Sequence, residues 1–413
     1  MKQTSRRSFL RRAGLGTAVL TFGGRVPQVL AAAARESRAE RILVVIELAG
    51  GNDGLNTVIP FRDDEYRRLR PVLALPATQV LKITDELGFH PSLRGFADLL
   101  QAGQLAVVQG VGYDTPNRSH FESMDIWHTC QRKEENRTDG WLGRYLAQAG
   151  ESAGGDPGGM HLGEEKQPLA LLSRAVQVPS IRSLSQFHLA GSDHARLHTA
   201  IRELTEPSRD SDNDLLDFVQ SGTSSALRAS QRLGTADQPY APTRPYPETS
   251  LAGRLQTIAQ LIHAGLQTRV YYVQLDGYDT HAQQADAHAG LLRQLGDAVS
   301  AFLADMIAQG HGDQLLVMCF SEFGRRVAEN ASEGTDHGTA GPMFLAGTGV
   351  GAGLIGSHPR LDDLADGDLR HQTDFRQVYA AVLQDWMGCE SQAILRGKFT
   401  PVPAISGKAH GRG

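Results

Sequence analysis

Acids and histidines gather in short polar clusters that follow apolar stretches of the sequence. The clusters contain Asp53; Asp276, Asp279 and His281; Ser321 and Glu322; and Asp336 and His337. A further cluster contains Thr115, Arg118, Ser119 and His120. Carboxylates that lie close together repel one another unless a cation neutralises them. Mixed oxygen and imidazole ligands suit zinc, manganese, magnesium or calcium, so these residue types predict a divalent metal site.

Each cluster, taken alone, also fits a structural role. Asp53 can cap a tight, glycine-rich turn. Asp276 and Asp279 can act as turn formers in DGYDTH, and Glu322 can form an ion pair with Arg325. The Asp-His pair between glycines near the end of the chain also fits a flexible surface loop. The metal site therefore depends on whether the fold brings the clusters together.

The elements that must position these clusters follow from the apolar periodicity. Five short apolar runs predict buried strands, at residues 42–48, 105–111, 269–275, 314–320 and 342–346. Apolar residues at helical spacing predict helices at about 91–103, 251–266, 291–306 and 375–386. Alternating strands and helices predict an α/β fold with a doubly wound, mostly parallel sheet and helices on both faces. Parallel strands place their carboxyl ends at one edge of the sheet, so the clusters should converge there.

The amino terminus predicts export from the cytoplasm. Residues 5–11 read SRRSFLR, a twin-arginine pattern, and a mildly apolar stretch and a small-residue run follow up to about residue 34. We therefore expect a signal peptide at 1–34, the twin-arginine export machinery as a partner, and a periplasmic or secreted mature protein. The mature part, residues 35–413, is predicted to be one α/β domain with a less regular insertion at about 150–250 and no membrane span.

Charge and cysteine content exclude several classes of protein. The chain has 413 residues and a formal net charge of -5, without the basic footprint expected of a nucleic-acid-binding protein. Its three cysteines lack the CxxC spacing of a metal site. Cys319 lies in an apolar run and is predicted to be core, while a Cys130–Cys389 disulfide is compatible with an oxidising compartment.

An ordered set of motifs resembles a known family. RRSFL, ELAGGNDGLNT, RSHF, DGYDTH, SEFGRR and GTDHG follow one another from the leader to about Gly388. Together they resemble the exported bacterial proteins of domain-of-unknown-function family 1501. That family is similar in fold and motif order to the alkaline phosphatase and sulfatase superfamily, whose members cleave phosphate or sulfate esters with metal-bound nucleophiles. The resemblance implies an alkaline-phosphatase-like fold.

The resemblance also implies roles for individual residues. Asp53 matches a metal-ligand aspartate, and Asp279, His281 and the late His337 match the ligands of one metal, with Asp276 as a substitute. The implied catalytic residues are the nucleophile Ser119, its rival Thr115, and Arg118, which would steady the transferred oxyanion. Where the superfamily has Asp-His, this chain has Glu322-Phe323, so a second ion would need His120 or Asp336, or would be absent.

These observations lead to three hypotheses of function. The first is an exported, metal-dependent hydrolase of phosphate or sulfate esters that uses one or two ions of zinc, calcium or manganese, acting on a small or polymeric anionic ester. The second is a non-catalytic exported binding protein that retains the fold. The presence of Glu322-Phe323 where the superfamily has Asp-His favours this hypothesis. The third, a metal-dependent isomerase or mutase-like enzyme, has no distinguishing residue in the sequence.

Overall fold

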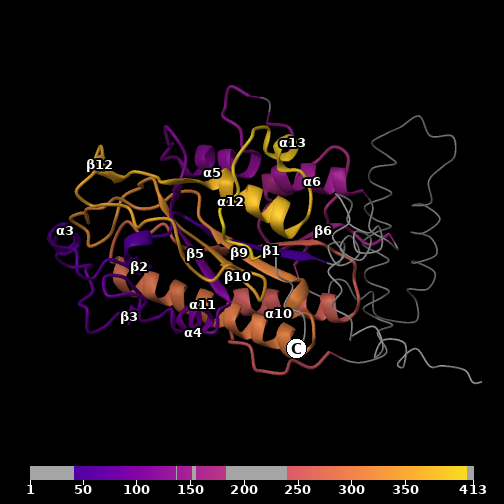
Figure 1. The fold of residues 1–413 in the computed structure, drawn as a ribbon, viewed down its shortest axis with the longest axis horizontal. Coiled ribbons are helices and arrows are strands. Elements are labelled where there is room, and N and C mark those ends of the chain that lie inside the picture. Colours follow the sequence, from indigo (N-terminus) through magenta and orange to yellow (C-terminus); the bar gives the residue numbers. More distant parts are fainter. Residues whose placement is uncertain (1–40, 136, 151–154, 183–239, 407–413) are drawn as a thin grey trace, which may run out of the picture. The chain divides into compact units, whose positions relative to one another are not determined.

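The sheet is built around β1 (Ile42–Ala49), all eight residues of which are buried. The structure is a computed structural model that describes residues 41–135, 137–150, 155–182 and 240–406. β1 pairs in parallel with β8 (Val270–Asp276) on one side and with β9 (Leu315–Phe320) on the other. All three strands end at the same edge, so the turns that follow them lie close together (Figure 1).

The main sheet has the strand order β11-β5-β10-β9-β1-β8-β6-β7 within the described residues. Its outer members are β5 (Leu105–Gly112), β6 (Gly159–Leu162), β7 (Ser180–Ile181), β10 (Gly341–Ala346) and β11 (Gly353–Ile355), and β14 (Thr373–Asp374) pairs with β5. β10 runs antiparallel to both of its neighbours, β5 and β9. The other pairings in this sheet are parallel, which confirms the predicted mostly parallel α/β sheet.

Helices cover both faces of the sheet (Figure 1). One face carries α4 (Arg94–Gln101), α10 (Ser250–His263) and α11 (Gln284–Ala308), whose buried residues form one core with Ile42, Val44, Ile46 and Leu48 of β1. The other face carries α5 (His120–Thr129), α6 (Trp141–Ala149) and α12 (Phe375–Ala381), which form a second core with Leu43 and Val45. The alternation of β1 residues between the two cores follows the two-residue period of a strand.

Smaller elements cover the edges of the sheet. They include a three-stranded sheet of β2 (Val58–Ile59), β4 (Gly88–Phe89) and β3 (Leu81–Lys82), and a hairpin-like pair of β12 (Leu364–Ala365) and β13 (Asp368–Leu369). Short helices are α3 (Asp64–Leu69) and α13 (Ser391–Leu395), with 3-10 segments at Gly54–Asn56, Leu169–Leu171 and Gly312–Gln314. A π-helical turn, Val382–Trp386, extends α12.

The structure confirms the predicted strands and differs from the sequence-based expectations for the insertion and for the cysteines. The five predicted strands occur within one or two residues of the expected bounds. β6 and β7 add two strands to the sheet inside the stretch predicted to be a less regular insertion. Residues 183–239 and the predicted signal peptide at 1–34 lie outside the described residues. Cys130, Cys319 and Cys389 are all free, so Cys130 and Cys389 do not form a disulfide in this structure. No helix in the described part of the chain is long and apolar enough to cross a membrane.

A glycine contact sets the distance between α4 and α11. A Cβ atom on Gly95 would lie 2.3 Å from the carbonyl oxygen of Gly296, so Gly95→Ala should force the helices apart and lower the free energy of unfolding by about 1–3 kcal/mol. A Cβ atom on Gly290, which is also in α11, would meet no neighbouring atom within 4 Å. Gly290→Ala should instead raise the stability by up to about 1 kcal/mol. Urea unfolding of the two variants and the parent checks both signs, and equal effects would contradict this packing.

Candidate metal centre

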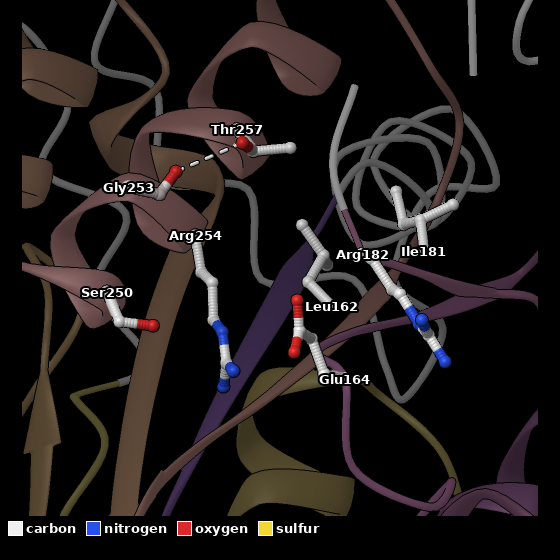
Figure 2. A pocket seen from close by; sticks show the side chains of 8 residues that line it. All are labelled: Leu162, Glu164, Ile181, Arg182, Ser250, Gly253, Arg254 and Thr257. Carbon is white, nitrogen blue, oxygen red and sulfur yellow. Dashed lines mark hydrogen bonds between the residues drawn. The ribbon is translucent and has the colours of Figure 1, made fainter. Parts of the chain in front are cut away.

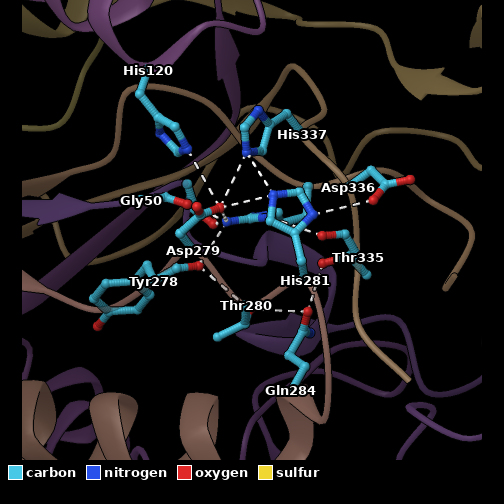
Figure 3. Close-up of polar contacts among 12 residues, drawn as sticks. Gly50, His120, Tyr278, Asp279, Thr280, His281, Gln284, Thr335, Asp336 and His337 are labelled. Atoms are coloured by element: carbon cyan, nitrogen blue, oxygen red, sulfur yellow. Dashed lines mark hydrogen bonds and ion pairs between the residues drawn. The ribbon is translucent and has the colours of Figure 1, made fainter. Parts of the chain in front are cut away.

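One carboxylate oxygen is the meeting point of three imidazoles at the carboxyl edge of the sheet. Nε2 of His281 lies 3.0 Å from Oδ1 of Asp279, and Nε2 of His337 lies 3.1 Å from the same oxygen. Nε2 of His120 lies 3.4 Å from it, and the Nε2 atoms of His281 and His337 are 2.9 Å apart. Figure 3 shows the three rings directed toward Asp279. The convergence predicted for Asp279, His281 and His337 is present in the structure, and His120 joins them.

Three separate segments bring these side chains together. His120 is the first residue of α5, after the loop that follows β5. Asp279 and His281 lie in the loop between β8 and α11, and His337 lies between β9 and β10. The backbone of His337 forms an isolated antiparallel bridge with Arg325, which holds this long connection over the sheet edge.

The second ring nitrogen of each histidine has its own partner. Nδ1 of His120 lies 2.7 Å from Oε1 of Glu322, and Nδ1 of His281 lies 3.2 Å from Oδ1 of Asp336. Nδ1 of His337 donates to the carbonyl oxygen of Arg118 at 2.8 Å. Acceptors at Nδ1 fix the ring orientation and place the proton on that nitrogen. Each Nε2 therefore presents a lone pair to the space around Asp279.

The ligand atoms fit a divalent cation. The Nε2 atoms of His281 and His337 are 2.9 Å apart, a separation that two ligands of one cation would also have. Nε2 of His120 is buried and makes no hydrogen bond to any residue that the structure describes. In a tetrahedral zinc site with bonds of about 2.0–2.1 Å, neighbouring ligand atoms lie about 3.3 Å apart. The separations of the three Nε2 atoms from Oδ1 of Asp279, and of His281 from His337, are 2.9–3.4 Å, and the ligand atoms of His120, Asp279 and His337 all lie within 4.8 Å of one another.

Electrostatics keep the central carboxylate ionised. Partial burial acts to raise the pKa of Asp279, but the hydrogen bond and the positive charge of Arg325 outweigh it and hold the pKa at about 2. The hydrogen bond to Glu322 raises the pKa of His120 above its ordinary value, and desolvation opposes this only in part. An anionic oxygen ligand and polarised imidazoles are the donors that zinc binds.

A buried arginine provides a fixed positive charge on the other side of Asp279. The guanidinium of Arg325 donates to Oδ1 of Asp279 at 2.7 Å and to the carbonyl oxygens of Gly51, Thr335 and Tyr278 at 2.7, 2.8 and 2.9 Å, and it also donates to that of Gly50. Arg325 is 2% exposed. The predicted Glu322–Arg325 ion pair is therefore replaced by a pair with Asp279, because the guanidinium points toward the turn after β1.

Two glycines make room for this arrangement. Gly50 and Gly51 have φ angles of 113° and 81°, which glycine adopts readily and other residues do not. A Cβ atom on Gly50 would lie 2.4 Å from the backbone nitrogen of Asp279. The turn after β1 therefore packs directly against the loop that carries the metal-ligand candidates.

Asp53 lies in a different, buried ion pair. Its Oδ2 accepts a hydrogen bond from Arg70 at 2.6 Å and another from Gln284, and its Oδ1 accepts from the backbone nitrogen of Asn56 at 3.4 Å. Burial acts to raise the pKa of Asp53, but the charge of Arg70 and its hydrogen bond outweigh this, so the pKa is below the ordinary value. Both oxygens are engaged and the side chain is 1% exposed, so in this structure Asp53 is the partner of Arg70 and not part of the histidine cluster.

Glu322 and Asp336 contact the imidazoles through Nδ1 and not through the Nε2 side where the cation would lie. Phe323 packs its ring 4.9 Å from those of His120 and His337. Apolar contact with the rings restricts their motion. These three residues therefore orient the histidines in the structure.

The predicted nucleophile region precedes His120 directly. Ser119 is the N-cap residue of α5, is exposed, and makes no side-chain cap hydrogen bond. Thr115 is also exposed and has a φ angle of 45°. The guanidinium of Arg118 forms an ion pair with the buried Asp368. Of the two hydroxyl groups, that of Ser119 is nearer in sequence to the histidine cluster.

A cavity of about 810 Å³ opens beside the cluster. Its wall includes His120, Asp279 and Glu322 from the centre, Gly50 from the turn after β1, and Asp276 at the end of β8. A second cavity, of about 480 Å³, lies between α10 and the segment around β6 and β7 (Figure 2). Arg254 in that second wall is held by Glu165 and by the carbonyl oxygen of Gln274. The first cavity is the one that reaches the candidate metal ligands.

The Arg70–Asp53 pair should stabilise the fold. Arg70→Met would leave the carboxylate of Asp53 buried without its cation, and we expect a loss of about 3–5 kcal/mol in unfolding free energy at neutral pH. Because the pKa of Asp53 is lowered in the folded state, the contribution of the pair is present above the ordinary value of 3.8 and is lost as the pH falls through the lower folded value. Urea unfolding at pH 7 and at low pH checks this, and Arg67→Met, at a half-exposed arginine, is the control. An unchanged stability of Arg70→Met would contradict it.

Several solved structures match most of the chain at low sequence identity and with TM-scores below 0.5. The PsFucS1 sulfatase from Pseudoalteromonas sp. is 11% identical with a TM-score of 0.41, and the match covers 93% of this chain and 77% of the sulfatase. Ps i-CgsB in complex with k-i-k-neocarrahexaose is 10% identical with a TM-score of 0.40, over 87% of this chain and 75% of the other. The alkaline phosphatase from the Antarctic bacterium TAB5 is 10% identical with a TM-score of 0.34, over 74% and 91%. No curated protein sequence matches the chain.

The sequence itself matches a family over most of its length. Residues 40–396 match the family described as "Protein of unknown function (DUF1501)". The matched region includes every strand of the main sheet and all four residues whose ligand atoms meet at the sheet edge. The family description assigns no activity, so the function has to be argued from the site. The chain belongs to the DUF1501 family.

Proposed function

We propose that the protein is a hydrolase of phosphate or sulfate esters that depends on one divalent cation, best matched by zinc. The ligands would be Oδ1 of Asp279 and the Nε2 atoms of His120, His281 and His337. The observation that supports this proposal most directly is the approach of three imidazole nitrogens to one carboxylate oxygen. Calcium prefers six to eight oxygen ligands, so the three imidazoles argue against it.

The same geometry supports a single ion. Arg325 donates to the carboxylate of Asp279, and Arg70 donates to that of Asp53. Each guanidinium neutralises an acid at the sheet edge, where a second cation would otherwise be needed. A second ion would have to displace a buried arginine with several backbone acceptors.

The residues around the centre suit an anionic ester. A bound divalent cation would polarise the ester as a Lewis acid. The hydroxyl of Ser119, which is not used to cap α5, is the proposed nucleophile, and the amide N–H groups of the first turn of α5 favour negative charge. Asp279 is half exposed, which leaves a side of the centre open toward the cavity. Catalytic zinc keeps one position free of protein ligands, so the ester oxygen would take the place of His281, the most exposed of the three imidazoles.

Metal content is the first test. Zinc-loaded protein should hold one ion per chain by elemental analysis. Glu322→Gln changes a residue that orients a ligand, and it should reduce zinc affinity by roughly 10–100-fold. His337→Ala removes a proposed ligand itself, so its loss of zinc affinity should be larger than that. His263→Ala, which removes an imidazole at the end of α10, is the matched control. Equal occupancy in His337→Ala and the parent would contradict the proposed ligands.

Hydrolysis of aryl phosphates and aryl sulfates is the second test. Ser119→Ala should lower kcat of the zinc-loaded protein by at least about 100-fold if its hydroxyl is the nucleophile. Thr115→Val removes the rival hydroxyl and should leave kcat close to the parent value. A loss in Thr115→Val alone would reverse the assignment, and full activity in both variants would exclude both hydroxyl groups.

A non-catalytic binding protein is the second candidate function. Phe323 against the histidine rings and Arg325 against Asp279 occupy space that a two-ion centre would need. Zinc-dependent binding of inorganic phosphate without turnover of any ester in the panel would favour this candidate. Export through the leader at residues 1–34 belongs to both proposals, since both assume a protein that works outside the cytoplasm.

A further inference from the structure

A second polar cluster, around Glu47 and His128, lines the same cavity as the candidate metal ligands, and the two groups are named here the Glu47 end and the metal end of the cavity. Glu47 is near the end of β1, is 3% exposed, and lines the cavity together with His128 and Gln274. Oε1 of Glu47 accepts a hydrogen bond from Gln274 at 2.9 Å. Oε2 accepts from the hydroxyl of Tyr272 and lies 3.2 Å from Nε2 of His128. None of these four residues was predicted from the sequence to belong to the site.

Among the described residues, the side chains that contact the carboxylate of Glu47 are those of Tyr272, Gln274 and His128, and none of them is a lysine or an arginine. Within the described ranges, no lysine or arginine lies within 4 Å of its carboxylate, and its ion-pair partner is an imidazole. Burial and the charge of Glu47 raise the pKa of Tyr272 above its ordinary value, so this hydroxyl keeps its proton and donates. A buried carboxylate is unfavourable without a compensating positive charge.

The remaining charges on the cavity wall are mostly negative. The acidic side chains there are Glu47, Asp125, Asp276, Asp279 and Glu322, and Lys166 is the basic side chain in the described part of the wall. Asp279 pairs with Arg325, Glu322 contacts His120, and Asp125 lies 3.6 Å from Arg137. Glu47 and Asp276 have no such arginine or lysine partner among the residues described. The wall beyond the metal centre therefore repels a second anion and attracts a cation.

Apolar groups lie along the wall between the two ends. Among the described residues, the exposed large apolar side chains are Val72, Phe121 and Leu172. Phe121 and Leu172 line this cavity together with Met124. Phe121 is 86% exposed, and exposure of so much of an aromatic side chain is unusual unless the side chain contacts a ligand or another protein. An exposed aromatic face beside carboxylates that have no arginine or lysine partner among the described residues is the combination that attracts organic cations.

Helix α5 sets the distance between the two ends. His120, Met124 and His128 all line the cavity and are spaced by four residues along α5, so they lie on one helix face. Eight residues at a rise of about 1.5 Å place His120 and His128 about 12 Å apart. A ligand that reaches both ends must therefore be elongated.

We propose that the Glu47 end of the cavity is a binding subsite for a positively charged nitrogen on the organic part of the ester, about 10–12 Å from the anionic group at the metal centre. This inference rests on the proposed function only for the binding of the anionic group of the substrate at the metal centre. It narrows the substrate class to esters with one anionic group and a cationic amine that are joined by an apolar spacer. Polyanionic esters are excluded, because Glu47 and Asp276 would repel them.

Binding of matched phosphonates to the zinc-loaded full chain tests the subsite without requiring catalysis. The probes are octylphosphonate, ω-aminooctylphosphonate and ω-carboxyoctylphosphonate, measured by calorimetry. We expect the amino compound to bind about tenfold more tightly than octylphosphonate, and the carboxy compound to bind more weakly than both. Equal affinities for the amino and unsubstituted compounds would overturn the proposal.

Three variants test whether the acidic residues of the subsite cause the preference for the amino compound. Glu47→Gln keeps the shape and an acceptor for Tyr272 while it removes the charge, and it should abolish the amino preference. Asp276→Asn, at an exposed position that does not endanger folding, should reduce the preference. Asp125→Asn removes a charge that already faces Arg137, and it should leave the preference unchanged. An amino preference that persists in Glu47→Gln and Asp276→Asn would overturn the assignment.

A comparison without any anionic end separates this proposal from the proposed function. Octylamine should bind more tightly than octanol to the parent and equally to Glu47→Gln. If no phosphonate binds but the octylamine preference is present, the metal-centre proposal fails and the subsite remains. If octylphosphonate binds in a zinc-dependent way and octylamine shows no preference, the subsite proposal fails and the metal centre remains.

Discussion

The negative charge of Asp279 is the interaction on which the arrangement of the sheet edge depends. Its Oδ1 lies between the guanidinium of Arg325 and three imidazole nitrogens. Arg325 also donates to carbonyl oxygens in the turn after β1, in the loop after β8 and in the β9–β10 connection. One buried side chain therefore joins three segments that are far apart in the sequence. The positions of the histidines relative to one another follow from this junction.

Two acids at the same edge are neutralised in different ways. Asp53 is fully enclosed with Arg70, whereas Asp279 is half exposed and shares its charge between a guanidinium and the imidazole cluster. A guanidinium balances charge but does not act as a Lewis acid, because its donors are fixed N–H groups. This difference concentrates any metal chemistry at Asp279. In this structure Asp53 caps the turn after β1 and pairs with Arg70.

The sequence was sufficient for the parts of the fold that depend on local pattern. The strand at 42–48 could be predicted because every residue in it is apolar except Glu47, and strand ends followed by acids and histidines indicated where Asp279, His281 and His337 would meet. Arg70 could not be selected, since it lies in a stretch with Arg62, Arg67 and Arg68 and its burial depends on contacts with residues 326 and 327.

Other parts of the site depend on side-chain direction, which periodicity does not give. His120 was considered only for a second ion, because its ring direction depends on Glu322, which lies 202 positions away. Glu47 was treated as part of a buried strand, and its contacts come from a neighbouring strand and from α5. The antiparallel direction of β10 also required the structure, because its short apolar run carries no signal for orientation.

That reversed strand has a consequence for how the protein can vary. Because β10 runs against β9, the connection at residues 321–340 leaves and re-enters the sheet at the same edge, with no helix on the opposite side to repack. Insertions or replacements in this connection can therefore alter the surroundings of His337 while the strand register stays the same. The exposed residues 331–333 of this connection, which lie between the segments that carry Arg325 and His337, are therefore the place to begin a redesign.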